Sequence, residues 1–210
     1  MSLTNYFSFV TAATFLAIIP GPGILFVLAQ TSKGGKSAGL SGSLGTGIGG
    51  MFHVLAGAVG ISAIVYSSSV AFDFVKTLGA LYLFFLGWKA LNEKRTISAE
   101  SLEQIKFENE SLKQGIITEA LNPKTALFFL ALVPQFINPT GHVASQFLLL
   151  GTTSVILNTS VDLLVVFFSD YLITHLRRSK FAARSFKYIS SLGYFGLGLL
   201  ALRASREARL

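Results

Sequence analysis

The main ionisable residues within otherwise apolar stretches of the chain are Glu119, Lys124 and Asp162. An ionised side chain in lipid costs on the order of 2.5–3.5 kcal/mol on insertion scales, so such a residue usually faces a partner or a water-filled cavity. A lysine binds carboxylates, and an aspartate can take up and release a proton. Lys124 and Asp162 therefore suit a zwitterionic ligand; the alternative is a structural ion pair of Lys124 with Asp162 or Glu119.

Two further polar residues lie in apolar surroundings. His53 stands between Gly50 and Gly57 and suits either a proton relay or a hydrogen-bonded core position. Asn158 precedes Asp162 by one helical turn and either orients it or joins two helices. The residue pattern leaves both alternatives open at both positions.

Prolines interrupt two of the apolar stretches, at Pro20-Gly21-Pro22-Gly23 and at Asn122-Pro123-Lys124. Inside a helix a proline removes a backbone donor and costs roughly 3 kcal/mol, so two such interruptions need a reason. Broken helices whose ends line a binding site supply one, and Gly21 and Gly23 would permit the backbone to move there. The expected substrate-binding and coupling residues are Pro20, Gly21, Pro22, Gly23, His53, Asn122, Pro123, Lys124, Asn158 and Asp162.

Glycines are concentrated between residues 35 and 50. Part of this run has the spacing of a dinucleotide-binding loop, but no strand precedes it and no acidic residue follows at the required distance. Small residues spaced by four instead favour close helix packing in lipid. They are Gly35, Gly39, Ser43 and Gly47, with Gly45 and Gly49 as a second pair.

Ser41 is the candidate nucleophile of an alternative function. The sequence Gly39-Leu40-Ser41-Gly42 is similar to the G-x-S-G of intramembrane serine proteases, which need a histidine base beside the serine. His53 would lie about 18 Å away on a continuous helix. That distance is too long for a catalytic pair on one helix. An intramembrane serine hydrolase and a non-transporting membrane scaffold are kept as the two alternatives to a protein that binds and transports a zwitterionic ligand.

Composition points to a membrane protein. Apolar residues make up 51% of the 210 residues and charged residues 13%. The net charge of +7 is not arranged as a basic stripe with stacking aromatics, so no nucleic acid is expected as a partner. Without cysteine the chain has no disulfide or thiolate metal site, and we expect neither a metal nor a cofactor. The 19 phenylalanines are interpreted as lipid-facing bulk.

Six apolar segments approach or exceed the roughly 20 residues that a helix needs to cross a bilayer. Backbone groups in lipid must be paired within each segment, so the predicted fold is all-α and polytopic. The segments are Tyr6–Gln30, Leu44–Tyr66, Val70–Leu91, Gly115–Ile137, Val143–Ile173 and Phe186–Leu202.

A polar stretch of mixed charge separates three spans from three. An odd number of crossings inverts the second half relative to the first, as in inverted-repeat transporters. We predict a single transmembrane domain over residues 1–210, with halves at about 1–92 and 113–204, a cytoplasmic loop at 93–113, and broken helices 1 and 4. Because Arg203, Arg206 and Arg209 fit an external tail poorly, a five-span topology with the tail inside stays open.

The chain resembles the lysine exporter (LysE/RhtB) family over nearly its whole length. The resemblance rests on Pro20-Gly21-Pro22-Gly23, the glycine-rich run to His53, Gly79-Ala80-Leu81-Tyr82-Leu83 with Gly87, Asn122-Pro123-Lys124-Thr125-Ala126-Leu127-Phe128-Phe129 followed by Pro134-Gln135-Phe136, and Asp162. Glu119 and the basic tail are not part of that pattern.

The resemblance implies a multi-pass exporter of the bacterial inner membrane, and no enzyme. Such a protein would move amino acids or close derivatives, such as homoserine, threonine, leucine or lysine, out of the cell. Its partners would be the amino-acid substrate, a proton or other coupling ion, and the lipid bilayer. Whether it forms a homo-oligomer is left open.

Overall fold

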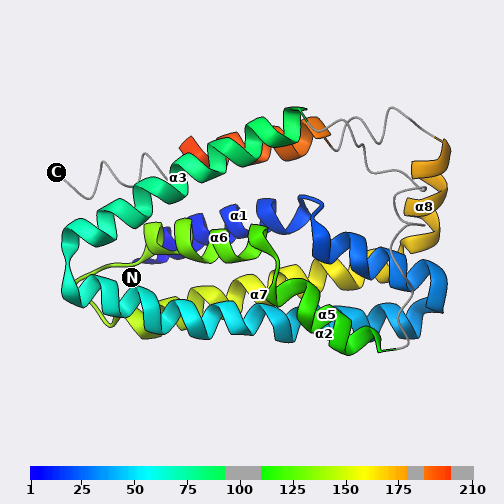
Figure 1. Cartoon of the computed structure of the whole chain (residues 1–210), viewed down its shortest axis with the longest axis horizontal. Coiled ribbons are helices and arrows are strands. Elements are labelled where there is room, and N and C mark those ends of the chain that lie inside the picture. Colours follow the sequence, from blue (N-terminus) through cyan, green and yellow to red (C-terminus); the bar gives the residue numbers. More distant parts are fainter. Residues whose placement is uncertain (93–109, 179–186, 200–210) are drawn as a thin grey trace.

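The computed structural model describes residues 1–92, 110–178 and 187–199, and the regular elements in these ranges are helices (Figure 1). They are α1 (Leu3–Ile18), α2 (Pro22–Ser67), α3 (Ser69–Asn92), α5 (Ser111–Ala120), α6 (Pro123–Ala131), the 3-10 helix η1 (Val133–Phe136), α7 (Val143–Phe167), α8 (Ser169–Arg178) and a last helix over residues 187–199. The all-α prediction is confirmed. Most of the predicted loop 93–113, and the basic tail, lie outside the described residues.

Three helical segments are long and apolar enough to cross a membrane: Pro22–Val65, Asp73–Asn92 and Val143–Phe167. A fourth candidate is the pair Ser111–Ala120 and Pro123–Phe136, which bends by 46° at its break. The apolar helix Leu3–Ile18 is shorter. The described residues thus contain both unbroken and broken apolar helices, as the sequence predicts. The number of six membrane crossings stays a prediction.

Helix α2 reverses direction at Gly35, which has φ 74° and ψ −178° (Figure 1). This backbone conformation is essentially restricted to glycine. The two limbs of α2, residues 22–34 and 36–67, lie side by side, because a Cβ at Gly42 would lie 3.1 Å from the Phe26 ring. One glycine makes the turn, and the helix of the second limb begins directly after it, before Leu44, where the predicted second span starts.

The glycine spacing has two different meanings in the structure. Gly45 and Gly49 pack against the backbone of α5, where a Cβ at Gly49 would lie 2.6 Å from the Ile116 carbonyl oxygen. Gly47 faces Thr159 of α7. Close packing is thus confirmed at these positions. It is wrong for Gly35, whose surroundings are open and whose role is the turn.

Both predicted proline breaks are present. Chain direction changes between α1 and α2 and again between α5 and α6, where Pro22 and Pro123 open the following helix. Asn122 caps α6 by accepting a hydrogen bond from the Lys124 amide at 3.0 Å. A proline is tolerated at the first position of a helix because its missing N–H would be unpaired there anyway.

The fifth predicted span is too long at its end. Helix α7 stops at Phe167, and Ser169 begins the amphipathic α8, which lies across the end of the bundle (Figure 1). The apolar residues Tyr171, Leu172 and Ile173 extended the predicted segment although they belong to a new helix. An amphipathic helix in this position suits the membrane–water interface.

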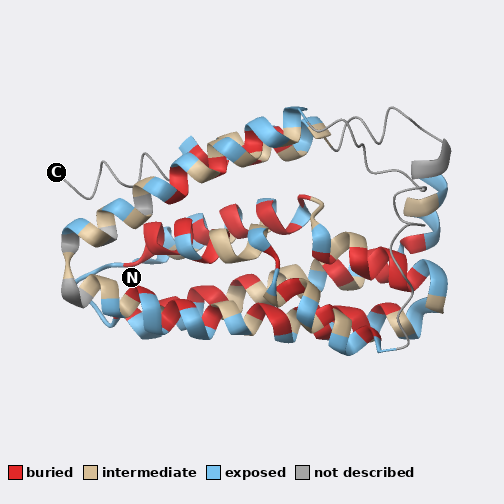
Figure 2. Cartoon of the chain, viewed as in Figure 1, coloured by how far each residue is buried: buried red, intermediate tan, exposed pale blue. Residues whose placement is uncertain are grey.

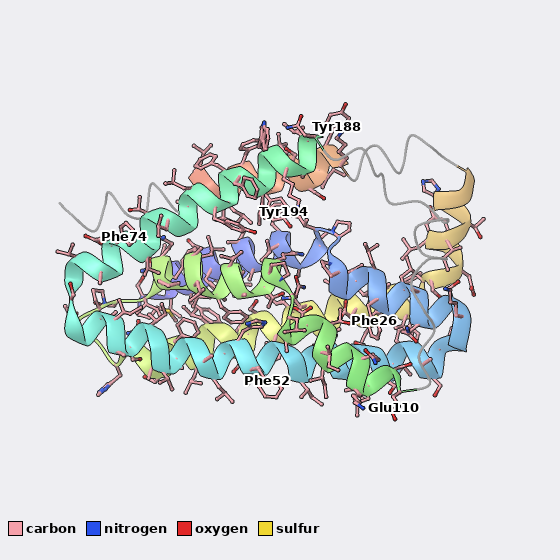
Figure 3. All side chains as sticks on the ribbon, in the orientation of Figure 1. Phe26, Phe52, Phe74, Glu110, Tyr188 and Tyr194 are labelled. Carbon is pink, nitrogen blue, oxygen red and sulfur yellow. The ribbon has the colours of Figure 1, made fainter. Side chains whose placement is uncertain are left out.

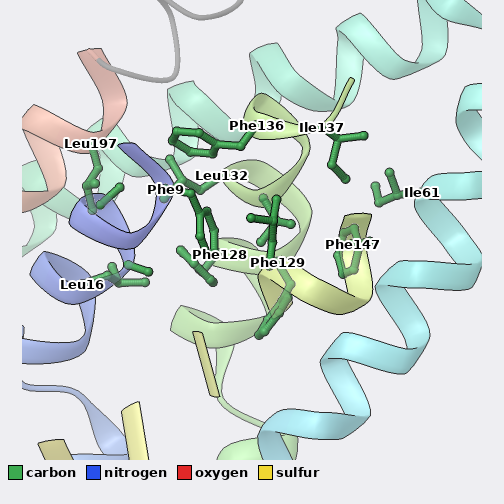
Figure 4. Close-up of a cluster of buried hydrophobic side chains, with 14 of the residues drawn as sticks. Phe9, Leu16, Ile61, Phe128, Phe129, Leu132, Phe136, Ile137, Phe147 and Leu197 are labelled. Carbon is green, nitrogen blue, oxygen red and sulfur yellow. The ribbon is translucent and has the colours of Figure 1, made fainter. Parts of the chain in front are cut away.

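Buried residues face between the helices and exposed ones face outward (Figure 2). Phe52 and Phe74 point outward with more than half of their surface exposed, while Tyr194 of the last helix points inward (Figure 3). The interpretation of the phenylalanines as lipid-facing bulk is wrong for Phe9 and Phe147, whose exposure is 0%. They belong to a buried aromatic and aliphatic cluster between α1, α6 and α7 (Figure 4).

Candidate functional site

Lys124 joins the two proline breaks. Its ammonium donates hydrogen bonds to the carbonyl oxygens of Leu16, at 2.9 Å, and Ile19, at 2.6 Å. In a continuous helix the Leu16 carbonyl would accept from residue 20, but Pro20 has no N–H. The Leu16 carbonyl also accepts from the Ile19 amide at 3.2 Å, so Lys124 adds a second donor there and binds the Ile19 carbonyl at the break itself.

His53 does the same for the second break. Its Nε2 lies 2.9 Å from the carbonyl oxygen of Glu119, whose regular helical partner would be the missing N–H of Pro123 and which also accepts from the Asn122 amide at 3.0 Å. A carbonyl can only accept, so Nε2 is the donor. The ring stacks on Phe129, with centroids 6.0 Å apart. His53 is thus placed beside the site rather than among the residues that line it.

Glu119 occupies the space between the breaks. Its carboxylate accepts hydrogen bonds from Asn122 Nδ2 at 2.9 Å and from Thr125 Oγ1 at 2.5 Å. A Cβ at Gly23 would lie 2.7 Å from Glu119 Oε2, and one at Gly21 would lie 3.0 Å from Lys124 Cδ. Both glycines therefore make room for charged side chains; movement of the backbone there stays a prediction.

Asp162 is held by a residue that the sequence analysis did not name. Its Oδ2 lies 2.7 Å from Thr46 Oγ1, on the second limb of α2. Asn158 donates to its own helix instead, to the Ser154 carbonyl at 2.9 Å. The expectation that Asn158 orients Asp162 therefore has no hydrogen bond in its support.

These groups line one pocket, which contains about 460 Å³ of space free of protein atoms and is partly open to the outside. Six of the predicted site residues line it: Gly21, Gly23, Asn122, Lys124, Asn158 and Asp162. Pro20, Pro22, His53 and Pro123 adjoin it in sequence or contact without being part of its lining. Lining residues missed by the prediction include Thr46, Thr125, Phe129, Val155 and Thr159; Glu119, which the sequence singled out as a charge in an apolar stretch without assigning it to the site, lines the pocket too.

Charge is unevenly balanced in the pocket. Its described lining has one cationic group, Lys124, and two carboxylates, Glu119 and Asp162. Lys124 makes no ion pair within 4.0 Å with either of them in the described part of the chain; the salt bridge found there is the exposed Lys113–Glu110. The ammonium is directed at backbone carbonyls, so the simple structural ion pair is not the observed arrangement.

These features define a helical membrane protein with a polar pocket between broken helices. Residues 14–205 match the family model described as LysE type translocator, and the chain therefore belongs to this family of transporters. Its members are not enzymes, and Ser41 is not among the residues that line the pocket.

Several curated relatives align over most of the chain. A leucine efflux protein of Enterobacter sp. (strain 638) is 29% identical over 202 residues, covering 94% of this chain and 90% of the relative. A homoserine/homoserine lactone efflux protein of Salmonella typhi is 30% identical over 169 residues, covering 79% of each. A membrane protein of Bacillus subtilis (strain 168) is 29% identical over 201 residues, covering 91% of this chain and 95% of the relative. No solved structure matches the chain.

Proposed function

We propose that this protein is a secondary transporter that exports amino acids or close derivatives across the inner membrane, coupled to proton entry. Membership in the LysE type translocator family supports transport. The names of the leucine and homoserine efflux proteins support a substrate of the amino-acid class. Leucine, homoserine, threonine and lysine are the candidates to test.

The observation that carries the proposal is the position of Lys124 between the two breaks. An ammonium has three N–H donors, and two of them go to Leu16 and Ile19. The third is left for an anionic ligand. The first turn of α2 has no side-chain cap, and Gly21, Gly23 and Ile24 line the same pocket, so backbone N–H groups of a helix N-terminus lie beside the ammonium. A substrate carboxylate would bind between them.

The carboxylates of the pocket complete the proposed mechanism. Glu119 and Asp162 can receive the substrate's ammonium group, and Asp162 would alternately bind and release the coupling proton. With both carboxylates ionised the lining carries one net negative charge, which one proton would neutralise. A zwitterionic substrate adds no net charge, so the pocket carries one net negative charge with substrate bound and none when a proton replaces it.

The proposed membrane arrangement follows from the two broken spans. α1 with the first limb of α2, and α5 with α6, would be the first helices of two inverted halves of three spans each. The loop between the halves would face the cytoplasm, as predicted from the positive residues. The pocket would then open alternately to the two sides as one half moves against the other.

Transport in proteoliposomes tests the proposal. Vesicles loaded with radiolabelled leucine, homoserine, threonine or lysine are given a pH gradient, and efflux is followed. We expect efflux of at least one of these, with Lys124→Met and Asp162→Asn lowering it tenfold or more. The matched controls Lys113→Met and Asp170→Asn change exposed residues and should stay within twofold of wild type.

Two outcomes would refute different parts of the proposal. If the wild-type protein exports none of the four amino acids, the proposed function is wrong and the non-transporting scaffold is favoured. Wild-type rates in both pocket variants would leave export intact but remove the roles of Lys124 and Asp162.

A further inference from the structure

Thr46 carries one hydroxyl proton between two acceptors. Its Oγ1 lies 2.7 Å from Asp162 Oδ2 and 2.8 Å from the carbonyl oxygen of Ser43 in its own helix. A carbonyl and an ionised carboxylate can only accept hydrogen bonds, and a hydroxyl has one proton to donate. Both contacts are therefore full two-centre hydrogen bonds at the same time only when Asp162 is protonated and donates to Thr46 Oγ1, because an ionised Asp162 leaves one proton to be shared or assigned to one acceptor.

Other threonines of the protein show what is unusual here. Thr31, also buried in α2, donates to the Val27 carbonyl at 2.7 Å, and Thr14 donates to the Val10 carbonyl at 2.8 Å. This is the ordinary bond of a threonine within a helix. Thr46 has a bond of this kind, to the carbonyl three rather than four residues back, and its hydroxyl also contacts a carboxylate oxygen from a residue 116 positions away.

We propose that Thr46 is the positioning residue through which the proton on Asp162 controls the packing of α2 against α7. This inference rests on the proposed proton-coupled export. When Asp162 is ionised, Thr46 donates to Oδ2 and gives up its bond to Ser43. When Asp162 is protonated, it donates to Thr46, which donates to Ser43. The Ser43 carbonyl thus gains or loses its bond from Thr46 each time Asp162 binds or releases a proton.

The surroundings of Thr46 can respond to this change. Ser43 is fully buried, and its hydroxyl has no hydrogen-bond partner among the described residues, so this turn of α2 has an unused donor beside the carbonyl that Thr46 would release. Gly45 and Gly47 flank Thr46 and contact α5 and α7 directly. A change at Thr46 therefore acts at a point where three helices touch.

The proton balance of the step is simple. Asp162 takes one proton from water on one side of the membrane and releases it to water on the other, and no other covalent bond forms or breaks. The remaining charged groups that line the pocket are Glu119 from α5 and Lys124 from α6. Thr46 is on α2, where this helix contacts α7. Its hydroxyl proton changes from one acceptor to another, and the residue itself never becomes charged.

Comparing two assays, net efflux and substrate exchange, separates a defect in proton coupling from a defect in substrate binding. Net efflux requires the protein to return with a proton, whereas exchange of internal labelled leucine for external unlabelled leucine at equal pH does not. We expect Thr46→Val, which removes the hydroxyl and keeps the shape, to lower the ratio of net efflux to exchange about tenfold. Thr46→Ser should restore the ratio to within threefold, and the matched control Thr31→Val should leave it unchanged.

Each result bears on a stated claim. Measurable exchange by Thr46→Val shows that the variant is folded and binds substrate. An unchanged ratio in Thr46→Val, or an equal loss in Thr46→Ser, overturns the inference while the proposed function stands. If wild type shows no leucine transport, the same assay is run with homoserine, threonine and lysine; absence of efflux and exchange for all four removes the proposed function and the inference with it.

Discussion

Replacing Gly49 by alanine tests the packing that holds the second limb of α2 against α5. A Cβ at this position would lie 2.6 Å from the Ile116 carbonyl oxygen and 2.9 Å from Glu119 Cβ. Ordinary van der Waals contacts begin at 3.4 Å, so the helices must separate by roughly 0.8 Å. A gap of that size forfeits roughly a quarter to a half of the attraction between facing atoms.

The expected loss of stability for Gly49→Ala is about 1–3 kcal/mol, the usual range for overpacking a close interface. The matched control is Gly60→Ala in the same helix, because nothing lies within 4 Å of a Cβ there. An alanine is about 0.5–1 kcal/mol better than glycine inside a helix, so this control should be neutral or stabilising. The two variants therefore shift stability in opposite directions.

Thermal unfolding of the detergent-purified protein measures this difference. For a chain of this length about 1 kcal/mol corresponds to roughly 2–4 °C, so Gly49→Ala should lower the apparent melting temperature by about 2–12 °C. Gly60→Ala should not lower it. Equal melting temperatures for the two variants would show that α2 and α5 are not in the close contact on which the site depends.

Two further predictions concern the turn and the histidine. Gly35→Ala should lower stability by about 1–3 kcal/mol, measured by the same unfolding assay, because the φ of 74° disfavours any side chain although the space is open; an unchanged melting temperature would exclude this turn. His53→Ala should cost about 0.5–1.5 kcal/mol, the net value of one hydrogen bond, because the Glu119 carbonyl keeps the Asn122 amide as a donor at 3.0 Å. His53→Gln should recover part of that stability and support proton-driven efflux. Full stability with lost efflux in His53→Gln would instead identify His53 as a proton relay.

The sequence was sufficient for features with a local cause. Proline lacks an N–H wherever it stands, so the breaks at Pro20 and Pro123 could be predicted without a structure. Lys124 and Asp162 could be singled out because a charge in an apolar stretch is costly in any fold. Glu119 was found by the same argument, but its partners Asn122 and Thr125 lie across the break and were not deduced.

Other features depend on packing between distant segments. Gly35 has the same spacing as the packing glycines, and only the return of the second limb onto the first distinguishes it. Thr46 gives no local signal of its contact with Asp162, since threonine is common in apolar helices and ordinarily bonds to its own backbone. The end of α7 was misplaced because Tyr171–Ile173 is as apolar as the helix before it.

The bond between Lys124 and the end of α1 limits when the site can open. The two breaks separate only if the ammonium gives up the Leu16 and Ile19 carbonyls, and a buried cation without partners is too costly to persist. An arriving anionic group supplies replacement partners at that moment. Under the proposed exchange, a carrier that has bound neither substrate nor proton would therefore stay latched, which would protect the cell's ion gradient from leakage.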